Sequence, residues 1–128
     1  MSEIKAGLRY TKEHEWIEKL DDGTGKVGMS DHAQHEMTEI VYVELPEVGK
    51  KVKKGDVIGV VESVKTVSDV YSPASGEVVE VNSDLEGSPQ SINESPYGEG
   101  WMAIIRLEDE AELEGLMDSD AYSQYLKE

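Results

Sequence analysis

Residues 43–52 read VELPEVGKKV, and residues 70–79 read VYSPASGEVV. The two stretches share Val, Pro, Gly and Val at the same spacing, 27 residues apart. Each has the pattern of a strand, a proline turn and a second strand, because proline ends a ladder and glycine accepts turn conformations. The same register places Gly55 on Asn82, and both residue types tolerate a positive φ in a turn. Two such copies predict a small two-sheet β-sandwich with approximate two-fold symmetry.

Between the two copies, Lys65 lies between two valine-rich runs. Residues 57–61 and 67–71 have the β-branched composition of strands. The repeat places Lys65 at the position of Thr38 in the first copy, just ahead of a strand. We therefore expect Lys65 in a surface turn that connects the two halves, with its amine in water. An amine on a rigid turn suits the attachment of a long mobile group.

The rest of the chain also divides into short strands. Further strands are expected at residues 15–20, 26–30, 40–44, 76–81 and 101–107. A tight turn at residues 22–25, DGTG, would join the first two of these strands as a hairpin. The chain is therefore predicted to be mostly β, and residues 1–128 are expected to form a single domain with an N-terminal hairpin extension.

Helical spacing is found in two segments. A short helix is expected at residues 31–37, after the helix-start pair Ser30 and Asp31. The apolar residues between 111 and 126 predict C-terminal helical segments, with Ser119 as the N-cap of the last one. Residues 83–100 are rich in turn-forming residues, and an ordered loop is expected there.

The composition excludes several classes of function. Twelve basic and 28 acidic residues give a net charge of −16, which repels phosphate backbones and anionic lipid headgroups. We therefore expect no nucleic-acid or membrane partner. The absence of cysteine excludes disulfides, thiolate metal sites and a thiol nucleophile. With no apolar run of transmembrane length and no targeting pattern at the start, the expected location is the cytoplasm.

Six stretches together resemble the H proteins of the glycine cleavage system, a family related to lipoyl and biotinyl domains. These are YTKEHEW (10–16), DHAQ (31–34), VYVELPEVG (41–49), ESVK (62–65), SDVYSPASGEVVEVN (68–82) and INESPYGEGW (92–101). They follow one another in the family's order and cover nearly the whole chain. The resemblance implies a barrel-sandwich hybrid fold of the lipoyl type. It also implies a carrier protein of a multienzyme system for glycine catabolism and one-carbon metabolism, and not an enzyme.

The resemblance assigns roles to four residues. Lys65 would carry lipoate as an amide (N6-lipoyllysine), and Glu62 lies in the segment read by the lipoate-attaching enzyme. Glu15 and Asp69 match the carboxylates that meet the aminomethyl-loaded arm when it folds back into a cleft of the carrier. Charge-assisted hydrogen bonds to the protonated amine are stronger where water is partly excluded, so such a cleft would preserve the labile group. No catalytic residue and no metal ligand are implied.

The implied partners are the enzymes of glycine cleavage. They are a PLP-dependent glycine decarboxylase, a tetrahydrofolate-dependent aminomethyltransferase, a flavoprotein dihydrolipoamide dehydrogenase and the lipoate-attaching enzyme. The carrier would shuttle the aminomethyl group of glycine between them, and tethering would keep the group at a high local concentration. The carrier itself is expected to be a monomer.

Other functions remain open at this stage. An H-like protein could act mainly as a lipoate relay, and a lipoyl domain of a 2-oxoacid dehydrogenase or a biotin carrier is a nearby alternative. Val64 and Thr66 flank the lysine where biotinyl sites have methionines, and the terminal segments exceed a minimal lipoyl domain. A metal hydrolase could use His32 and His35, although these do not form an H-E-x-x-H array. An acidic interaction module would leave Lys65 unmodified.

Overall fold

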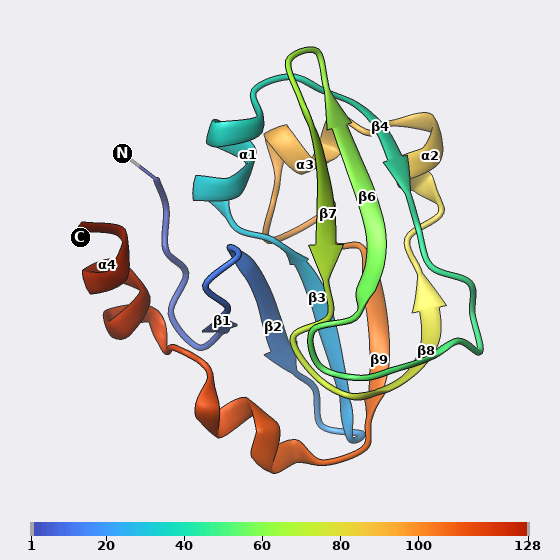
Figure 1. Ribbon diagram of the computed structural model, residues 1–128, viewed down its shortest axis with the longest axis vertical. Helices are drawn as coiled ribbons and strands as arrows, with labels where there is room; N and C mark the ends of the chain where they lie inside the picture. Colours follow the sequence, from blue (N-terminus) through green and yellow to red (C-terminus); the bar gives the residue numbers. More distant parts are fainter. Residues whose placement is uncertain (1, 128) are drawn as a thin grey trace.

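A computed structural model describes residues 2–127 as two antiparallel sheets packed face to face (Figure 1). In spatial order, the six-stranded sheet contains β1 (Arg9–Tyr10), β2 (Glu15–Lys19), β3 (Thr24–Met29), β9 (Ala103–Leu107), β8 (Gly76–Val81) and β5 (Lys51–Val52). The three-stranded sheet contains β4 (Ile40–Glu44), β6 (Val57–Ser63) and β7 (Val67–Tyr71). The predicted two-sheet β-sandwich is therefore confirmed, and within the described residues neither sheet closes into a barrel.

Short helices connect and cover the sheets. They are α1 (Asp31–Met37), α2 (Asp84–Gly87), α3 (Ser91–Glu94), the 3-10 helix η1 (Glu110–Gly115) and α4 (Ser119–Lys127). The predicted start of α1 is confirmed, because Ser30 Oγ accepts the backbone N–H of Ala33 at 3.1 Å. The predicted N-cap at Ser119 is wrong. The backbone N–H of Ala121 donates to Asp118 Oδ1 at 2.9 Å, so Asp118 caps α4.

The internal repeat corresponds to two strand–turn–strand units, β4–β5 and β7–β8. β4 and β7 lie on either side of β6, and β5 pairs with β8 in the other sheet. Gly55 has a φ of +94°, as the repeat predicts, but Asn82 does not adopt a positive φ. Asn82 is instead buried, and its side-chain amide donates to the carbonyls of Glu99 (2.7 Å) and Trp101 (2.8 Å). The repeat thus predicts the strands but not the role of each turn residue.

Some boundaries differ from the sequence prediction. The turn expected at residues 22–25 begins earlier, because Thr24 and Gly25 already belong to β3 and pair with β9. The expected loop at residues 83–100 contains α2 and α3. The last strand starts at Ala103, two residues later than expected. The strands β1 and β5 are only two residues long, which is too short for alternation to reveal them.

The main core lies between the two sheets. Its fully buried side chains come from both sheets and from the segments around α2 and α3, and include Ile17, Val27, Ile58, Val61, Val70, Val78, Leu85, Ile92, Met102 and Ile105. A second apolar cluster, formed by Leu8, Tyr10, Trp16 and Tyr122, packs β1 and β2 against α4. The rings of Tyr10 and Tyr122 are stacked with their centroids 4.3 Å apart. This cluster joins the first and last elements of the chain.

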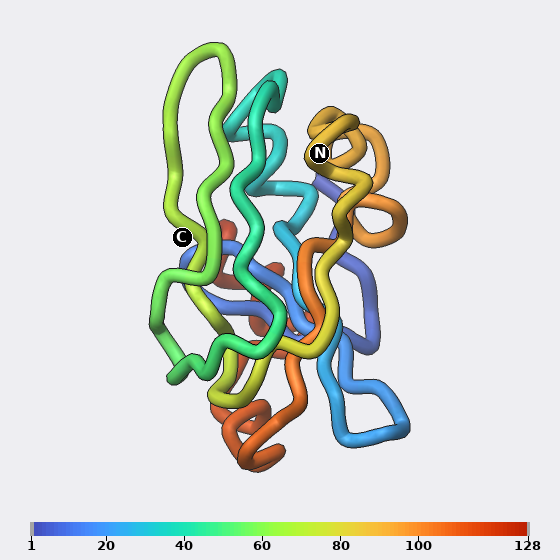
Figure 2. Tube along the Cα trace, turned by 90° about the vertical axis from the view of Figure 1, so that its right-hand side faces the viewer, coloured from blue at the N-terminus to red at the C-terminus, as the bar shows by residue number. Residues whose placement is uncertain are grey.

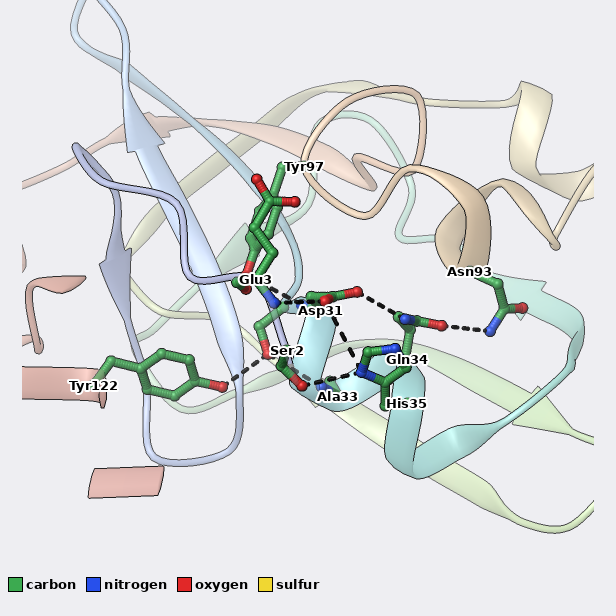
Figure 3. A network of polar contacts seen from close by, with 10 residues as sticks. Ser2, Glu3, Asp31, Ala33, Gln34, His35, Asn93, Tyr97 and Tyr122 are labelled. Carbon is green, nitrogen blue, oxygen red and sulfur yellow. Dashed lines mark hydrogen bonds and ion pairs between the residues drawn. The ribbon is translucent and has the colours of Figure 1, made fainter. Parts of the chain in front are cut away.

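Polar contacts fix the start of α1 to distant parts of the chain (Figure 3). Asp31 accepts the backbone N–H of Glu3 through Oδ2 at 2.7 Å, and its own backbone N–H donates to the hydroxyl of Tyr97 at 3.1 Å. Asn93 of α3 donates to Gln34 Oε1 at 2.9 Å. These contacts hold α1 at one end of the sandwich, directly before β4. No helix within residues 2–127 is long and apolar enough to cross a membrane.

The β6–β7 hairpin projects beyond the rest of the sandwich. Figures 1 and 2 both show the turn of this hairpin at one end of the molecule, away from the connection between β4 and β5. The turn residues Val64, Lys65 and Thr66 are all exposed. The fold therefore presents this turn to solvent from a two-stranded support.

Candidate functional site

Lys65 lies in the exposed turn between β6 and β7, where the repeat predicts it. The backbone N–H of Ser63 donates to the carbonyl of Thr66 at 2.8 Å and closes the turn. Ser63 Oγ accepts the backbone N–H groups of Lys65 at 3.2 Å and of Thr66 at 3.0 Å. Among residues 2–127, Lys65 has no ion-pair partner. One hydroxyl thus holds the main chain of the turn while the lysine side chain remains in solvent.

A cavity of about 260 Å³ lies beside Glu15 at the start of β2. Its walls come from the segment before β2, the end of β7, the loop before β6 and the strap between η1 and α4. The lining residues are Tyr10, Thr11, Lys12, Glu13, Glu15, Lys54, Gly55, Tyr71, Ser72, Pro73, Gly115, Leu116 and Met117. Four segments that are distant in sequence therefore meet around one carboxylate.

Glu15 is a buried acid, with only 3% of its surface exposed. The hydroxyl of Thr11 donates to its Oε1 at 2.5 Å, and the backbone N–H of Tyr71 donates to its Oε2 at 3.1 Å. Burial raises the pKa of Glu15 to about 7, although both hydrogen bonds favour the charged form and oppose the shift. No ion pair with Glu15 is formed within residues 2–127. The carboxylate could therefore hold a cationic group that enters the cavity.

The structure places the other two candidate acids on the outer face of the three-stranded sheet. Asp69 is exposed on β7, paired with Val60, and does not line the cavity. Asp69 is four positions beyond Lys65 in the sequence, a span of at most roughly 13 Å along an extended chain. Glu62 is half-buried on β6, three residues before Lys65. β7 connects the two regions, because Tyr71 contacts Glu15 only two residues beyond Asp69.

Sequence reasoning missed the two hydroxyl groups that hold these sites. Ser63 supports the lysine turn, and Thr11 orients Glu15. A serine two residues before an exposed turn residue is a recognised signal for a side-chain-to-backbone turn, so Ser63 could have been identified. Thr11 gave no such signal, because its contact with Glu15 depends on how the chain reverses before β2.

The histidines lie elsewhere, near α1 and α4. His14 has a φ of +73°, and its Nδ1 is 2.9 Å from the hydroxyl of Tyr122. The ring centroids of His14 and His32 are 4.6 Å apart, and burial, followed by the charge of His32, lowers the pKa of His14. Across the described part of the chain, no group of three or more His, Cys, Asp or Glu side chains could hold a metal ion. These residues thus offer no ligand cluster for the hydrolase alternative.

Similarity to known proteins extends over almost the whole chain. Residues 8–128 match the family model described as Glycine cleavage H-protein. The chain belongs to the glycine cleavage H-protein family. An H-protein relative described as probable, from Pyrococcus furiosus, is 60% identical over 125 residues, which cover 97% of this chain and 92% of the relative. The glycine cleavage system H protein of Symbiobacterium thermophilum is 52% identical over 128 residues, covering 100% of this chain and 99% of the relative.

A solved H-protein structure has the same fold. The crystal structure of a glycine cleavage system H protein from Mycobacterium marinum matches with a TM-score of 0.90 and 36% sequence identity, and the match covers 98% of this chain and 100% of that one. The resemblance found in the sequence is therefore confirmed, and the chain is an H-protein component of the glycine cleavage type.

Proposed function

We propose that this chain is the lipoylated carrier of glycine cleavage, with lipoate in amide linkage to Lys65. The observation that carries the proposal is the exposed Lys65 turn, held by Ser63, in a chain of the H-protein family. Bound lipoate would supply a disulfide that takes up the aminomethyl group of glycine and a dithiol that is later reoxidised. The chain itself would mount the arm, shelter its load and present both to the enzymes of the system.

The residues at the turn fit the attachment of lipoate. The side chain of Lys65 has no ion-pair partner among residues 2–127, so acylation would break no salt bridge there. Among residues 2–127, the hydrogen bonds that hold the turn involve main-chain groups and the Ser63 hydroxyl but not the lysine amine, so they persist when the amine becomes an amide. We propose the same partners as the family resemblance implies: the decarboxylase, the aminomethyltransferase, the dihydrolipoamide dehydrogenase and the lipoate-attaching enzyme.

The cavity beside Glu15 supports a sheltering role. A protonated amine close to the carboxylate would favour the charged form of Glu15 and lower its pKa from about 7. Glu15 would then bind the amine by a charge-assisted hydrogen bond in a site with little water. Asp69 is proposed to meet the amine from the outer side of β7, at the approach to this cavity.

Mass spectrometry of the intact protein tests the attachment site. Protein made in a lipoate-competent host should carry one lipoyl adduct, which the Lys65→Arg variant should lack. Lys54→Arg is a matched control, because Lys54 is also an exposed lysine in a loop next to β6. If the adduct persists in Lys65→Arg, lipoate is attached to another residue and the assignment of Lys65 is wrong. A wild-type protein that always has a bare Lys65 would reject the carrier function and favour the acidic interaction module.

A further inference from the structure

A row of three side chains crosses the outer face of the three-stranded sheet beside the Lys65 turn. Tyr42 of β4 pairs with Glu62 of β6, and Glu62 pairs with Val67 of β7. Directly paired residues of antiparallel strands project from the same face, with Cβ atoms about 4.5–5.5 Å apart. These three residues, termed the outer row here, therefore form one continuous strip across the sheet.

The alternation of burial shows that the outer row faces solvent. The neighbouring pair Val43 and Val61 is buried, with exposures of 3% and 0%, so the next residue along each strand points outward. Tyr42 is 48% exposed and Val67 is 60% exposed. Val64, in the turn itself, is 67% exposed. Exposed apolar side chains thus lie in and beside the turn that carries the lysine.

Apart from Lys65, the charged residues on this face of the sheet are all acidic. The next row along the same face contains Glu44, Val60 and Asp69, again two acids and one apolar residue. Across β4, β6, β7 and the turn between β6 and β7, Lys65 is the single basic residue. A partner that fits this face must therefore bring positive charge and an apolar surface.

We infer that the outer row is the docking surface for the enzyme that attaches lipoate to Lys65. This enzyme would present an apolar depression to Tyr42 and Val67, and an arginine or lysine to Glu62. The inference rests on the proposed function and deepens it, because it adds residues of two flanking strands to the recognition of the lysine. Tyr42 lies 23 positions from Lys65 in the sequence, so no linear motif around the lysine contains it.

The position of the row identifies the attaching enzyme as the partner. That enzyme must bring Lys65 Nζ into its own active centre, so it has to contact the surface next to the turn. Glu62 and Val67 directly flank the turn of residues 63–66. Enzymes that act on the distal end of the arm work at the far end of a long tether, and they can reach it without touching the hairpin.

The chemical step leaves the outer row unchanged. The nitrogen of Lys65 forms an amide bond with the carboxyl carbon of lipoyl-adenylate, and the bond from that carbon to the phosphate oxygen breaks. AMP leaves, and the ammonium group gives up two protons. The row contacts none of the reacting atoms. Its loss should therefore raise KM for the carrier more than it lowers kcat.

A lipoylation assay tests the inference on the full-length, unmodified chain. A purified lipoate-attaching enzyme is supplied with lipoate and ATP, and kcat/KM is measured for the wild type and for Tyr42→Thr, Glu62→Gln and Val67→Thr. Threonine has the β-branched shape that a strand favours, so neither substitution should disturb its strand. Each variant should lose about tenfold in kcat/KM, the equivalent of one moderate interface contact. Val48→Thr, an equally exposed valine (62%) in the connection between β4 and β5, should stay at the wild-type value.

Two further measurements separate docking from a structural effect. Acetylation of Lys65 by a small N-hydroxysuccinimide ester needs no docking, and its rate should be the same in all variants. Added salt should lower kcat/KM for the wild type but much less for Glu62→Gln, because the ion pair to the enzyme is then already absent.

The outcomes are distinct. Wild-type kcat/KM in all three row variants would overturn the docking surface, and so would a parallel loss of chemical acetylation, which would point to a distorted turn. A wild type that the enzyme never modifies at Lys65 would instead reject the proposed function itself. A loss confined to enzymatic modification of the row variants would support the inference.

Discussion

At the scale of single residues, Glu15 stands out because it is a buried carboxylate that, within residues 2–127, has hydrogen-bond donors but no cationic partner. The hydroxyl of Thr11 and the backbone of Tyr71 satisfy its two oxygens, yet burial still raises its pKa to about 7. The free protein therefore holds an acid that is partly protonated at neutral pH. Ionisation of such a buried group lowers the free energy of unfolding. A cation that enters the cavity would stabilise the ionised form and offset this loss.

This raised pKa predicts a pH-dependent stability. Because the folded pKa, about 7, lies above the ordinary value of 4.5, the folded state binds more protons than the unfolded state between these pH values. The free energy of unfolding should therefore fall as the pH rises from 4.5 to 7, by an amount on the order of 3 kcal/mol from Glu15 alone. Urea unfolding of wild type and Glu15→Gln at several pH values measures this difference. A difference that does not change with pH would contradict the raised pKa.

The proposed sheltering role makes a prediction about how long the aminomethyl-loaded form of the protein persists. Glu15→Gln combined with Asp69→Asn should speed the decay of the aminomethyl-loaded form by about tenfold, since one charge-assisted hydrogen bond is lost. Mass spectrometry of the loaded protein over time measures the decay, and Glu80→Gln, an exposed acid on β8, is the control. The single variants Glu15→Gln and Asp69→Asn show how much each acid contributes to the change in decay rate. An unchanged lifetime in the double variant would remove the pair from this role.

For single residues, the sequence predicts the secondary-structure element better than the burial of the side chain. Alternation places Glu15 in a strand, but β2 begins with three consecutive buried residues, Glu15, Trp16 and Ile17. Trp16 is covered by residues around Pro96 and α4, and Glu15 is covered by the end of β7. These covering segments are far away in sequence. The burial that raises the pKa could therefore not be derived from local pattern.

At the scale of elements, the repeat shows both the strength and the limit of sequence pattern. It predicts the β4–β5 and β7–β8 units, but its two aligned glycines serve different physical needs. Gly49 has a φ of +97°, a conformation that favours glycine. Gly76 has no positive φ, and an added Cβ there would clash with the carbonyl oxygen of Arg106 on β9. One glycine is required by the turn and the other by the closeness of a neighbouring strand.

The β6–β7 hairpin predicts an effect of Ser63→Ala. Without Ser63 Oγ, the backbone N–H groups of Lys65 and Thr66 lose their acceptor and form hydrogen bonds with water instead. The amide of Thr66 should exchange its hydrogen faster, while the stability of the whole fold falls by only about 0.5–1 kcal/mol because the turn is exposed. Hydrogen exchange followed by NMR measures this. Ser68→Ala, on the same hairpin, is the control, and equal exchange of Thr66 in both variants would contradict a supporting role of Ser63.

At the scale of the whole molecule, two apolar clusters stabilise the fold, and the excess of acidic over basic residues opposes them. The main core joins the two sheets, and the second cluster closes the chain by packing α4 on Tyr10 and Trp16. Composition predicts a core of this kind in 128 residues. The docking of the last helix on the first strands could not be predicted from composition, because the spacing of apolar residues in α4 defines a face but not its partner.

The net charge of −16 predicts that salt stabilises the fold. The ion pairs between described residues, Lys19–Glu110, His35–Asp31, Lys53–Glu108 and Arg106–Glu77, are exposed on at least one side, and such pairs contribute little. We therefore expect repulsion among the excess acids to outweigh these attractions at neutral pH, and salt would screen this repulsion. Raising NaCl from about 10 mM to 200 mM shortens the Debye length from about 30 Å to below 10 Å and should raise Tm by a few degrees. Calorimetry at pH 7 measures the change, and the same titration near the sequence pI of 4.4 is the control, where the effect should nearly vanish. A Tm that falls with salt at pH 7 would mean that the ion pairs are stronger than the repulsion.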